Sequence, residues 1–139
     1  MSLRYLLDSN ILSDLFRHPR GEIAKRISAE GETSICTSII VAAELKFGAE
    51  KSASKKLLTR VELILSALEI LPLERPADQH YGQIRQHLAN QGKIVGPNDL
   101  LIAAHARAMQ LTLVTANTHE FSRVPDLKVE NWLTLVRNP

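Results

Sequence analysis

The sequence predicts an α/β fold: a three-layer α/β/α sandwich with a central, mainly parallel sheet. Short apolar runs alternate with longer amphipathic segments along the whole chain, which is the pattern of parallel strands joined by helices that cover both faces of a sheet. The composition, with 45% hydrophobic and 23% charged residues, is that of a globular protein. A length of 139 residues suits one core. We therefore expect residues 1–139 to form a single domain.

The first part of the chain begins with a strand at residues 3–7 that turns at once into a helix. This strand is a short apolar run, and it ends at Asp8, Ser9 and Asn10, which are residue types that cap helices. The elements expected after it are helices over residues 11–17 and 22–30, a strand over 32–36, a helix over 39–50, and an amphipathic helix from about 55 to 68.

The second part continues the alternation and contains the most apolar helix of the chain. Gly96 and Pro97 open this helix, because proline suits a first helical turn. The elements expected here are a strand over residues 69–73, a helix from 77 to near 92, the apolar helix over 98–109, a strand over 111–115, a short turn or helix around 118–121, and a strand around 127–130.

Two acidic residues fall on helix faces that should be apolar. Helical spacing places Glu44 on one stripe with Ile40 and Phe47, and we expect this stripe to face the interior. Asp99 shares a face with Ile102 in the apolar helix, and it lies in the first turn, where the helix dipole favours a negative charge. Carboxylates are almost never buried unless they are paired or bound to a metal ion, so both positions suggest a site.

The other two acidic residues lie at one edge of the predicted sheet. Asp8 follows the first strand, and Glu120 lies just beyond the strand over 111–115. In open parallel sheets, ligands bind at the carboxyl ends of the strands. We therefore expect Asp8, Glu44, Asp99 and Glu120 to meet in one cleft.

Carboxylates gathered in one cleft need protons or cations to compensate their charge. Two like charges about 4 Å apart repel by roughly 4 kcal/mol at an effective dielectric constant of 20. An all-oxygen set without His or Cys suits Mg²⁺ or Mn²⁺ rather than zinc, and Mg²⁺ often binds through one or two carboxylates together with a substrate phosphate. The expected chemistry is therefore metal-assisted phosphoryl transfer.

Each acidic residue also has a purely structural explanation, which the sequence leaves open. Asp8 could be only a helix N-cap, and Asp99 only a stabilising first-turn charge. A helix face shifted by one residue would leave Glu44 in solvent, and Glu120 taken alone is typical of a protein surface. The joint placement of the four residues is what favours a site.

The composition restricts the partners and the compartment. A net charge of +2 and 4% aromatic residues exclude a binder built on a strongly basic field or on stacked bases. The single cysteine, Cys36, permits no internal disulfide and fits a reducing compartment. The sequence has no apolar stretch typical of a signal peptide or a membrane span, so we expect a cytoplasmic protein with no membrane partner.

Four segments resemble the successive motifs of a PIN domain of the VapC toxin type. They are LLDSNIL at 6–12, SIIVAAEL at 38–45, GPNDLLIAAHA at 96–106 and TLVTANTHEF at 112–121. The resemblance extends over essentially the whole chain. It implies a PIN-like fold and a metal-dependent ribonuclease toxin that a cognate VapB-type antitoxin holds inactive and that forms a homodimer.

The resemblance also assigns roles to particular residues. Asp8, Glu44, Asp99 and Glu120 match the four acidic positions of the family, which implies that they are catalytic and bind Mg²⁺ or Mn²⁺. Ser9 matches a small hydroxyl residue beside the first acid, and Asn117 matches a polar position near the site. The implied reaction hydrolyses structured RNA such as tRNA or ribosomal RNA and leaves a 5′-phosphate and a 3′-hydroxyl, because water is the nucleophile.

Two basic runs could hold RNA phosphates or an antitoxin. One contains Lys46, Lys51, Lys55, Lys56 and Arg60, and the other contains Arg17, His18, Arg20, Lys25 and Arg26. Runs of this kind are usually solvated surface.

Other α/β proteins with acidic clusters fit the sequence less well. A response-regulator receiver needs a lysine after a late strand and an aspartate after a middle strand, and the chain offers neither at 115–117 or 71–73. A haloacid-dehalogenase-like phosphatase needs two acids at alternate positions after the first strand, where only Asp8 is present. A non-catalytic RNA- or antitoxin-binding module of PIN-like fold stays open as the alternative.

Overall fold

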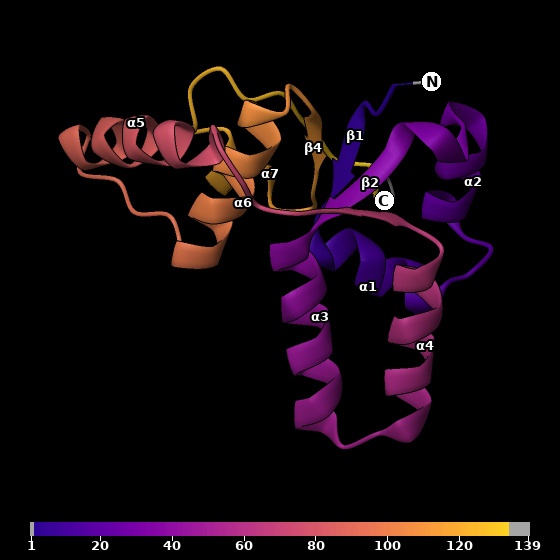
Figure 1. Cartoon of the computed structure of the whole chain (residues 1–139). Helices are drawn as coiled ribbons and strands as arrows, with labels where there is room; N and C mark the ends of the chain where they lie inside the picture. Colours follow the sequence, from indigo (N-terminus) through magenta and orange to yellow (C-terminus); the bar gives the residue numbers. More distant parts are fainter. Residues whose placement is uncertain (1, 134–139) are drawn as a thin grey trace, which may run out of the picture.

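A computed structural model describes residues 2–133 and contains a five-stranded sheet in which all strands are parallel (Figure 1). The strands lie in the order β3-β2-β1-β4-β5. Their bounds are β1 Tyr5–Leu7, β2 Ile35–Ser38, β3 Glu69–Leu71, β4 Thr112–Val114 and β5 Val129–Glu130. Residue 1 and residues 134–139, the two ends of the expected single domain, lie outside the described residues.

The helices occupy nearly the segments that the sequence predicts. They are α1 Ser9–Arg17, α2 Glu22–Glu30, α3 Ile39–Ser52, α4 Lys55–Ser66, α5 Ala77–Asn90, α6 Pro97–Ala108 and α7 Thr118–Phe121. The strand expected at 32–36 starts later, because Glu32–Ser34 forms a single 3₁₀ turn (η1) after Gly31. Gly31 has a φ of +94°, a conformation that suits glycine and separates the turn from α2.

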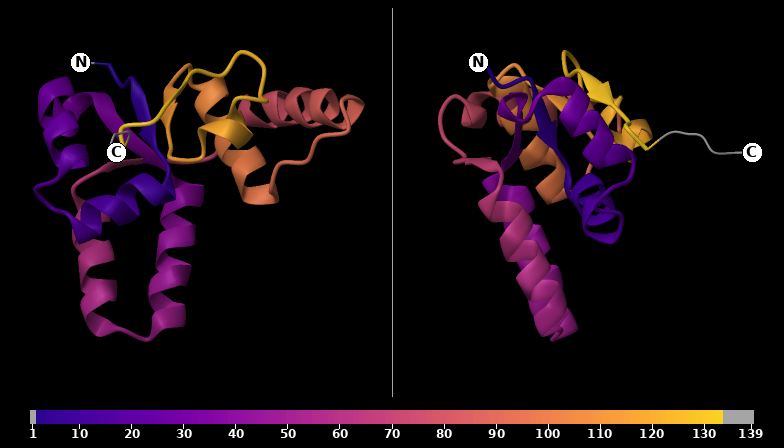
Figure 2. Two further views of the ribbon diagram at one scale, coloured as in Figure 1. Left: turned by 180° about the vertical axis from the view of Figure 1, so that it is seen from behind. Right: turned by 90° about the vertical axis from the view of Figure 1, so that its right-hand side faces the viewer.

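The connections between the strands build three layers. From β1 through β2 to β3 the chain crosses the sheet in one direction, and β4 returns to the other side of β1. Right-handed crossovers therefore place α1 and α2 on one face and α5 and α6 on the other, as Figures 1 and 2 show. Between these layers lies a core in which β1 and β4 are buried almost throughout. The predicted α/β/α sandwich is confirmed.

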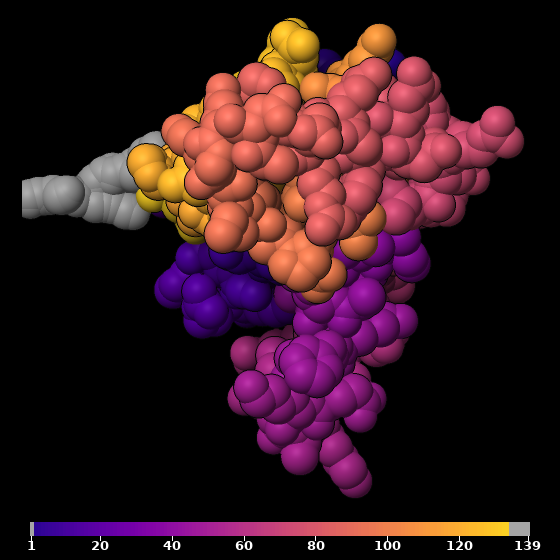
Figure 3. Space-filling model, turned by 90° about the vertical axis from the view of Figure 1, so that its left-hand side faces the viewer, coloured from indigo at the N-terminus to yellow at the C-terminus, as the bar shows by residue number. Residues whose placement is uncertain are grey.

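Helices α3 and α4 form an antiparallel hairpin that extends beyond the carboxyl ends of the strands (Figures 1 and 2). Figure 3 shows the hairpin standing clear of the rest of the molecule. Each helix has a serine N-cap: Ser38 Oγ accepts from the Ile40 N–H, and Ser54 Oγ accepts from the Leu57 N–H. No helix within residues 2–133 has the length and apolar character needed to cross a membrane.

The predicted interior face of α3 is wrong. The helix buries Val41, Ala42, Leu45 and Ala49, whereas the side chain of Phe47 is 67% exposed. Residues 39–43 are all apolar, so the sequence offers several helical faces of similar hydrophobicity, and packing against α1 and α4 decides between them. Glu44 consequently lies half-buried at the margin of the packed face.

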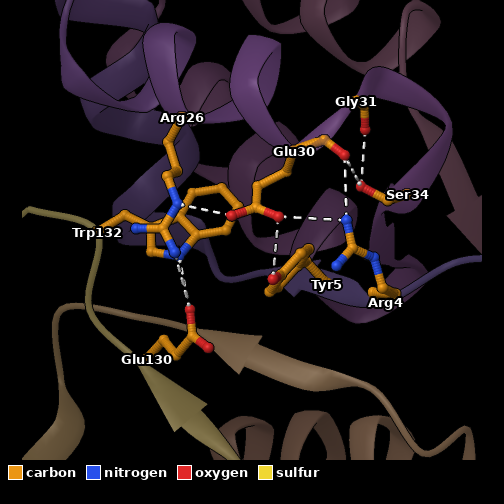
Figure 4. Close-up of polar contacts among 8 residues, drawn as sticks. All are labelled: Arg4, Tyr5, Arg26, Glu30, Gly31, Ser34, Glu130 and Trp132. Atoms are coloured by element: carbon orange, nitrogen blue, oxygen red, sulfur yellow. Dashed lines mark hydrogen bonds and ion pairs between the residues drawn. The ribbon is translucent and has the colours of Figure 1, made fainter.

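A polar and aromatic network fastens α2 to β1 and to the segment after β5 (Figure 4). The Arg26 guanidinium lies over the Trp132 ring, 4.8 Å from its centroid, and pairs with Glu30 at 3.0 Å and Glu130 at 3.4 Å. Trp132 in turn meets the Tyr5 ring edge to face, and the Tyr5 hydroxyl donates to Glu30. Arg26 is therefore part of the scaffold.

Candidate active site

The site lies where the strand order reverses. Strands β1 and β4 are neighbours, and the segments that follow them turn toward opposite sides of the sheet. This divergence opens a crevice at the carboxyl ends of the two strands. Asp8 directly follows β1, and Thr115 directly follows β4. The backbone N–H of Asp8 donates to the Val114 carbonyl at 2.9 Å, which holds the two strand ends together.

Asp8 is both the N-cap of α1 and a buried member of the site. Its Oδ1 accepts from the Ser9 N–H at 2.8 Å, and its Oδ2 accepts from the Thr115 hydroxyl at 2.8 Å. Only 3% of the residue is exposed. Burial raises the pKa of Asp8, the two hydrogen bonds oppose that rise, and the charge of Glu44 adds to it. The structural and functional explanations of this residue therefore coexist.

Thr115 is the centre of a hydrogen-bond network that sequence reasoning missed. Its Oγ1 also accepts from Asn10 Nδ2 at 3.3 Å and from the Asn117 N–H at 3.0 Å. Asn10 Oδ1 accepts from the Ala116 N–H at 2.9 Å. The available signal was a hydroxyl residue that closes the strand next to the one ending at Asp8. The network fixes the Asp8 carboxylate from the opposite side of the crevice.

Glu120 enters from α7 and is held by backbone and side-chain donors. Its Oε1 accepts from Asn117 Nδ2 at 2.5 Å, and its Oε2 accepts from the Gly96 N–H at 3.3 Å. Gly96 is the N-cap of α6, whose first turn carries Asp99. Asn117 and Gly96 thus bring Glu120 to the N-terminal end of the helix that carries Asp99.

Asp99 is the acid most affected by the others. Burial raises its pKa to about 7, with further contributions from a hydrogen bond to Glu120 and from the charges of Asp8, Glu120 and Glu44. A carboxyl with this pKa is partly protonated near neutral pH. The structure therefore brings Asp99 close enough to the other three predicted acids for their charges to affect it.

Glu44 has an unsatisfied oxygen. Its Oε2 accepts from Asn98 Nδ2 at 3.3 Å, a contact that the sequence did not suggest. Its Oε1 is buried and has no hydrogen-bond partner among residues 2–133. A buried carboxylate oxygen without a partner is unfavourable, and a bound cation would satisfy it.

The four acidic side chains lie around the crevice but do not converge on one position. Within residues 2–133, no three carboxylate, imidazole or thiol groups stand close enough to enclose a metal ion. This spacing suits Mg²⁺, which binds through one or two carboxylates and completes its shell with water and substrate oxygens. Ser9 lies beside the acids and lines, with Glu44, a groove between α1, α3 and α4.

Comparisons with known proteins agree with this architecture. Residues 5–127 match the PIN domain family. The ribonuclease VapC2 of Haemophilus influenzae is 41% identical over 132 residues, which cover 94% of this chain and 99% of the relative. The tRNA(fMet)-specific endonuclease VapC of Shigella flexneri is 38% identical over 131 residues, which cover 94% and 98%.

Solved structures with a similar fold come from the same group of proteins. The crystal structure of VapBC2 from Rickettsia felis, bound to a DNA fragment from the promoter, contains a chain that matches with a TM-score of 0.88 and 37% identity. The match covers 95% of this chain and 99% of that one. The chain therefore belongs to the PIN domain family and, within it, to the VapC group of ribonucleases.

Proposed function

We propose that this chain is the toxin of a toxin–antitoxin pair and acts as a metal-dependent endoribonuclease. The observation that carries the proposal is the acidic crevice at the strand reversal, where the pKa of Asp99 is raised to about 7 and Glu44 has an unpaired buried oxygen. Both features indicate a site that lacks positive charge. A divalent cation together with an RNA phosphate would complete it.

In this proposal Asp8, Glu44, Asp99 and Glu120 hold Mg²⁺ or Mn²⁺. Such an ion would supply an activated water and would offset the charge that develops at the phosphate. Thr115 and the Ser9 N–H orient the Asp8 carboxylate, and Asn117 orients Glu120. The products are a 5′-phosphate and a 3′-hydroxyl, because the RNA 2′-hydroxyl does not attack.

The substrate and partners follow from the relatives. The Shigella relative is named for tRNA(fMet), and we propose a tRNA or ribosomal RNA as the substrate here. The VapBC structure points to a VapB-type antitoxin as the protein partner. Because cellular RNA of this kind is found in the cytoplasm, we expect the chain to act there.

We also propose a homodimer, with the outer face of α3 as its contact. Ile39 is 45% exposed and Phe47 67% exposed, and both lie on the face of α3 that the core leaves uncovered. Large apolar side chains in such an arrangement favour association.

The test is cleavage of total cellular RNA by the purified chain with EDTA or with added Mg²⁺. We expect cleavage only with the metal ion, and loss of cleavage in Asp8→Asn and Asp99→Asn. Asp78→Asn, which changes an exposed acid on α5, is the matched control and should cleave normally. Cleavage that persists in EDTA and in both site variants would refute the metal mechanism. RNA binding without any cleavage would instead support the non-catalytic module.

A further inference from the structure

The two basic runs meet at one groove. Arg17, at the C-terminal end of α1, and Arg60, on α4, line the same groove of about 490 Å³ between α1, α3 and α4. Ser9 and Glu44 belong to the lining too, so the groove is continuous with the acidic crevice. Ser9 and Arg17 are the two ends of α1, so about 12 Å of helix separates the acids from the arginine.

The other basic residues with defined contacts are already engaged elsewhere. Arg26 belongs to the network of Glu30, Glu130 and Trp132 shown in Figure 4. Lys46 pairs with Glu62 at 3.8 Å. The side chains of Arg17 and Arg60, by contrast, are exposed and make no ion pair or hydrogen bond with any of residues 2–133. Their guanidinium groups are therefore available to a ligand.

Two arginines favour an anionic strand in this groove, whose walls also carry apolar side chains such as Phe16 and Leu57. A phosphate chain that approaches the acidic crevice is repelled by it, and positive charge farther along the strand offsets that repulsion. Arginine binds phosphate oxygens in a bidentate geometry that lysine cannot reproduce. The half-buried Ser13, on the same wall of α1, adds a hydroxyl between the acids and Arg17.

We propose that Arg17 and Arg60 bind phosphates of the RNA strand on one side of the scissile bond, with the strand lying in the groove between α1, α3 and α4. This inference deepens the proposed ribonuclease function and depends on it. The arginines bind and position the substrate; the acids of the crevice act on it.

Two measurements on the 139-residue chain test the proposal. The first is equilibrium binding of a short fluorescein-labelled single-stranded RNA in EDTA, which reports on the groove without cleavage. We expect Arg17→Gln and Arg60→Gln each to weaken binding about 5- to 20-fold, and each to reduce the slope of log affinity against log salt by about 0.7. Arg17→Lys and Arg60→Lys, which keep the charge, should recover part of the loss.

The second measurement is the rate of RNA cleavage with Mg²⁺. Both glutamine variants should raise KM by a similar factor and change kcat less than about twofold, because substrate positioning remote from the reacting phosphate acts mainly on binding. Arg75→Gln, at an exposed arginine beside α5 and outside the groove, is the matched control and should behave as the parent chain does.

The outcomes separate the two proposals. A parent chain that binds RNA through both arginines but does not cleave it would refute the ribonuclease function and retain the groove. The groove assignment would be overturned if Arg17→Gln and Arg60→Gln had the same RNA affinity and the same KM as Arg75→Gln. The groove assignment also fails if the variants lose affinity for the antitoxin while their RNA affinity stays unchanged, because the groove would then belong to the protein partner.

Discussion

Replacing Asp99 with asparagine should stabilise the metal-free protein at alkaline pH. The pKa of Asp99 is raised from 3.8 to about 7, chiefly by burial and by the Glu120 carboxyl. A shift of this size corresponds to about 4 kcal/mol, since each pH unit represents roughly 1.4 kcal/mol. Asp99 is only half-buried, and solvent screening reduces the expected effect to about 1–2 kcal/mol.

The pH dependence has a defined sign. The folded state holds the Asp99 proton more tightly than the unfolded state, so this residue lowers the free energy of unfolding progressively as pH rises from about 4 to about 7. An asparagine side chain cannot ionise, so the advantage of the variant should be absent at pH 4 and complete at pH 8. Above about pH 7, where Asp99 is ionised, loss of its favourable charge at the N-terminus of α6 subtracts about 0.5 kcal/mol from this advantage.

Thermal unfolding in EDTA measures this effect. We expect the Tm of Asp99→Asn to exceed that of the parent by about 2–6 °C at pH 8 and to match it at pH 4. Added Mg²⁺ should stabilise the parent more than the variant and so narrow the difference. Asp78→Asn serves as the control. A variant that melts at or below the parent temperature at pH 8 would show that the carboxylates do not repel one another as the geometry requires.

Four further changes test other parts of the structure. Thr115→Val removes the hydroxyl donor to Asp8 and should lower the free energy of unfolding at pH 8 by about 1–3 kcal/mol in urea titrations, with a loss of cleavage. Ser38→Ala removes the N-cap of α3 and should cost about 1–2 kcal/mol in the same assay. Arg26→Gln should destabilise by about 1 kcal/mol and leave RNA cleavage unchanged. Phe47→Glu should convert the proposed homodimer to a monomer in light scattering, with the helical circular dichroism retained.

The helices could be predicted closely because their ends are encoded locally. Asp8 and Ser38 accept hydrogen bonds from the N–H groups of the helices that they begin, and Pro97 occupies the first position of α6. Strand ends depend on partners that are distant in sequence. The strand expected at 127–130 is shorter in the structure, where β5 contains Val129 and Glu130 and pairs with Leu113 and Val114 of β4.

In the candidate site, too, features encoded locally could be predicted and features that depend on distant contacts could not. The four acids could be selected because a charge on an apolar face or at a strand end is locally unusual. The sequence could not predict which face of α3 is buried, and so could not place Glu44, because only packing against α1 and α4 distinguishes the apolar faces of this helix. Thr115 and Asn98 were missed because their importance lies in contacts with Asp8 and Glu44, more than fifty residues away.

The position of β1 between β2 and β4 has a consequence for the newly made protein. Asp8 is synthesised early, but the hydroxyl that holds it belongs to Thr115, which follows β4 and is 107 residues away. A nascent chain that stops before β4 leaves one side of β1 unpaired and lacks Glu120 as well. The crevice can therefore be assembled only after β4 and α7 have been synthesised, so its formation depends on contacts between the two most distant parts of the sheet core rather than on the segment that carries Asp8.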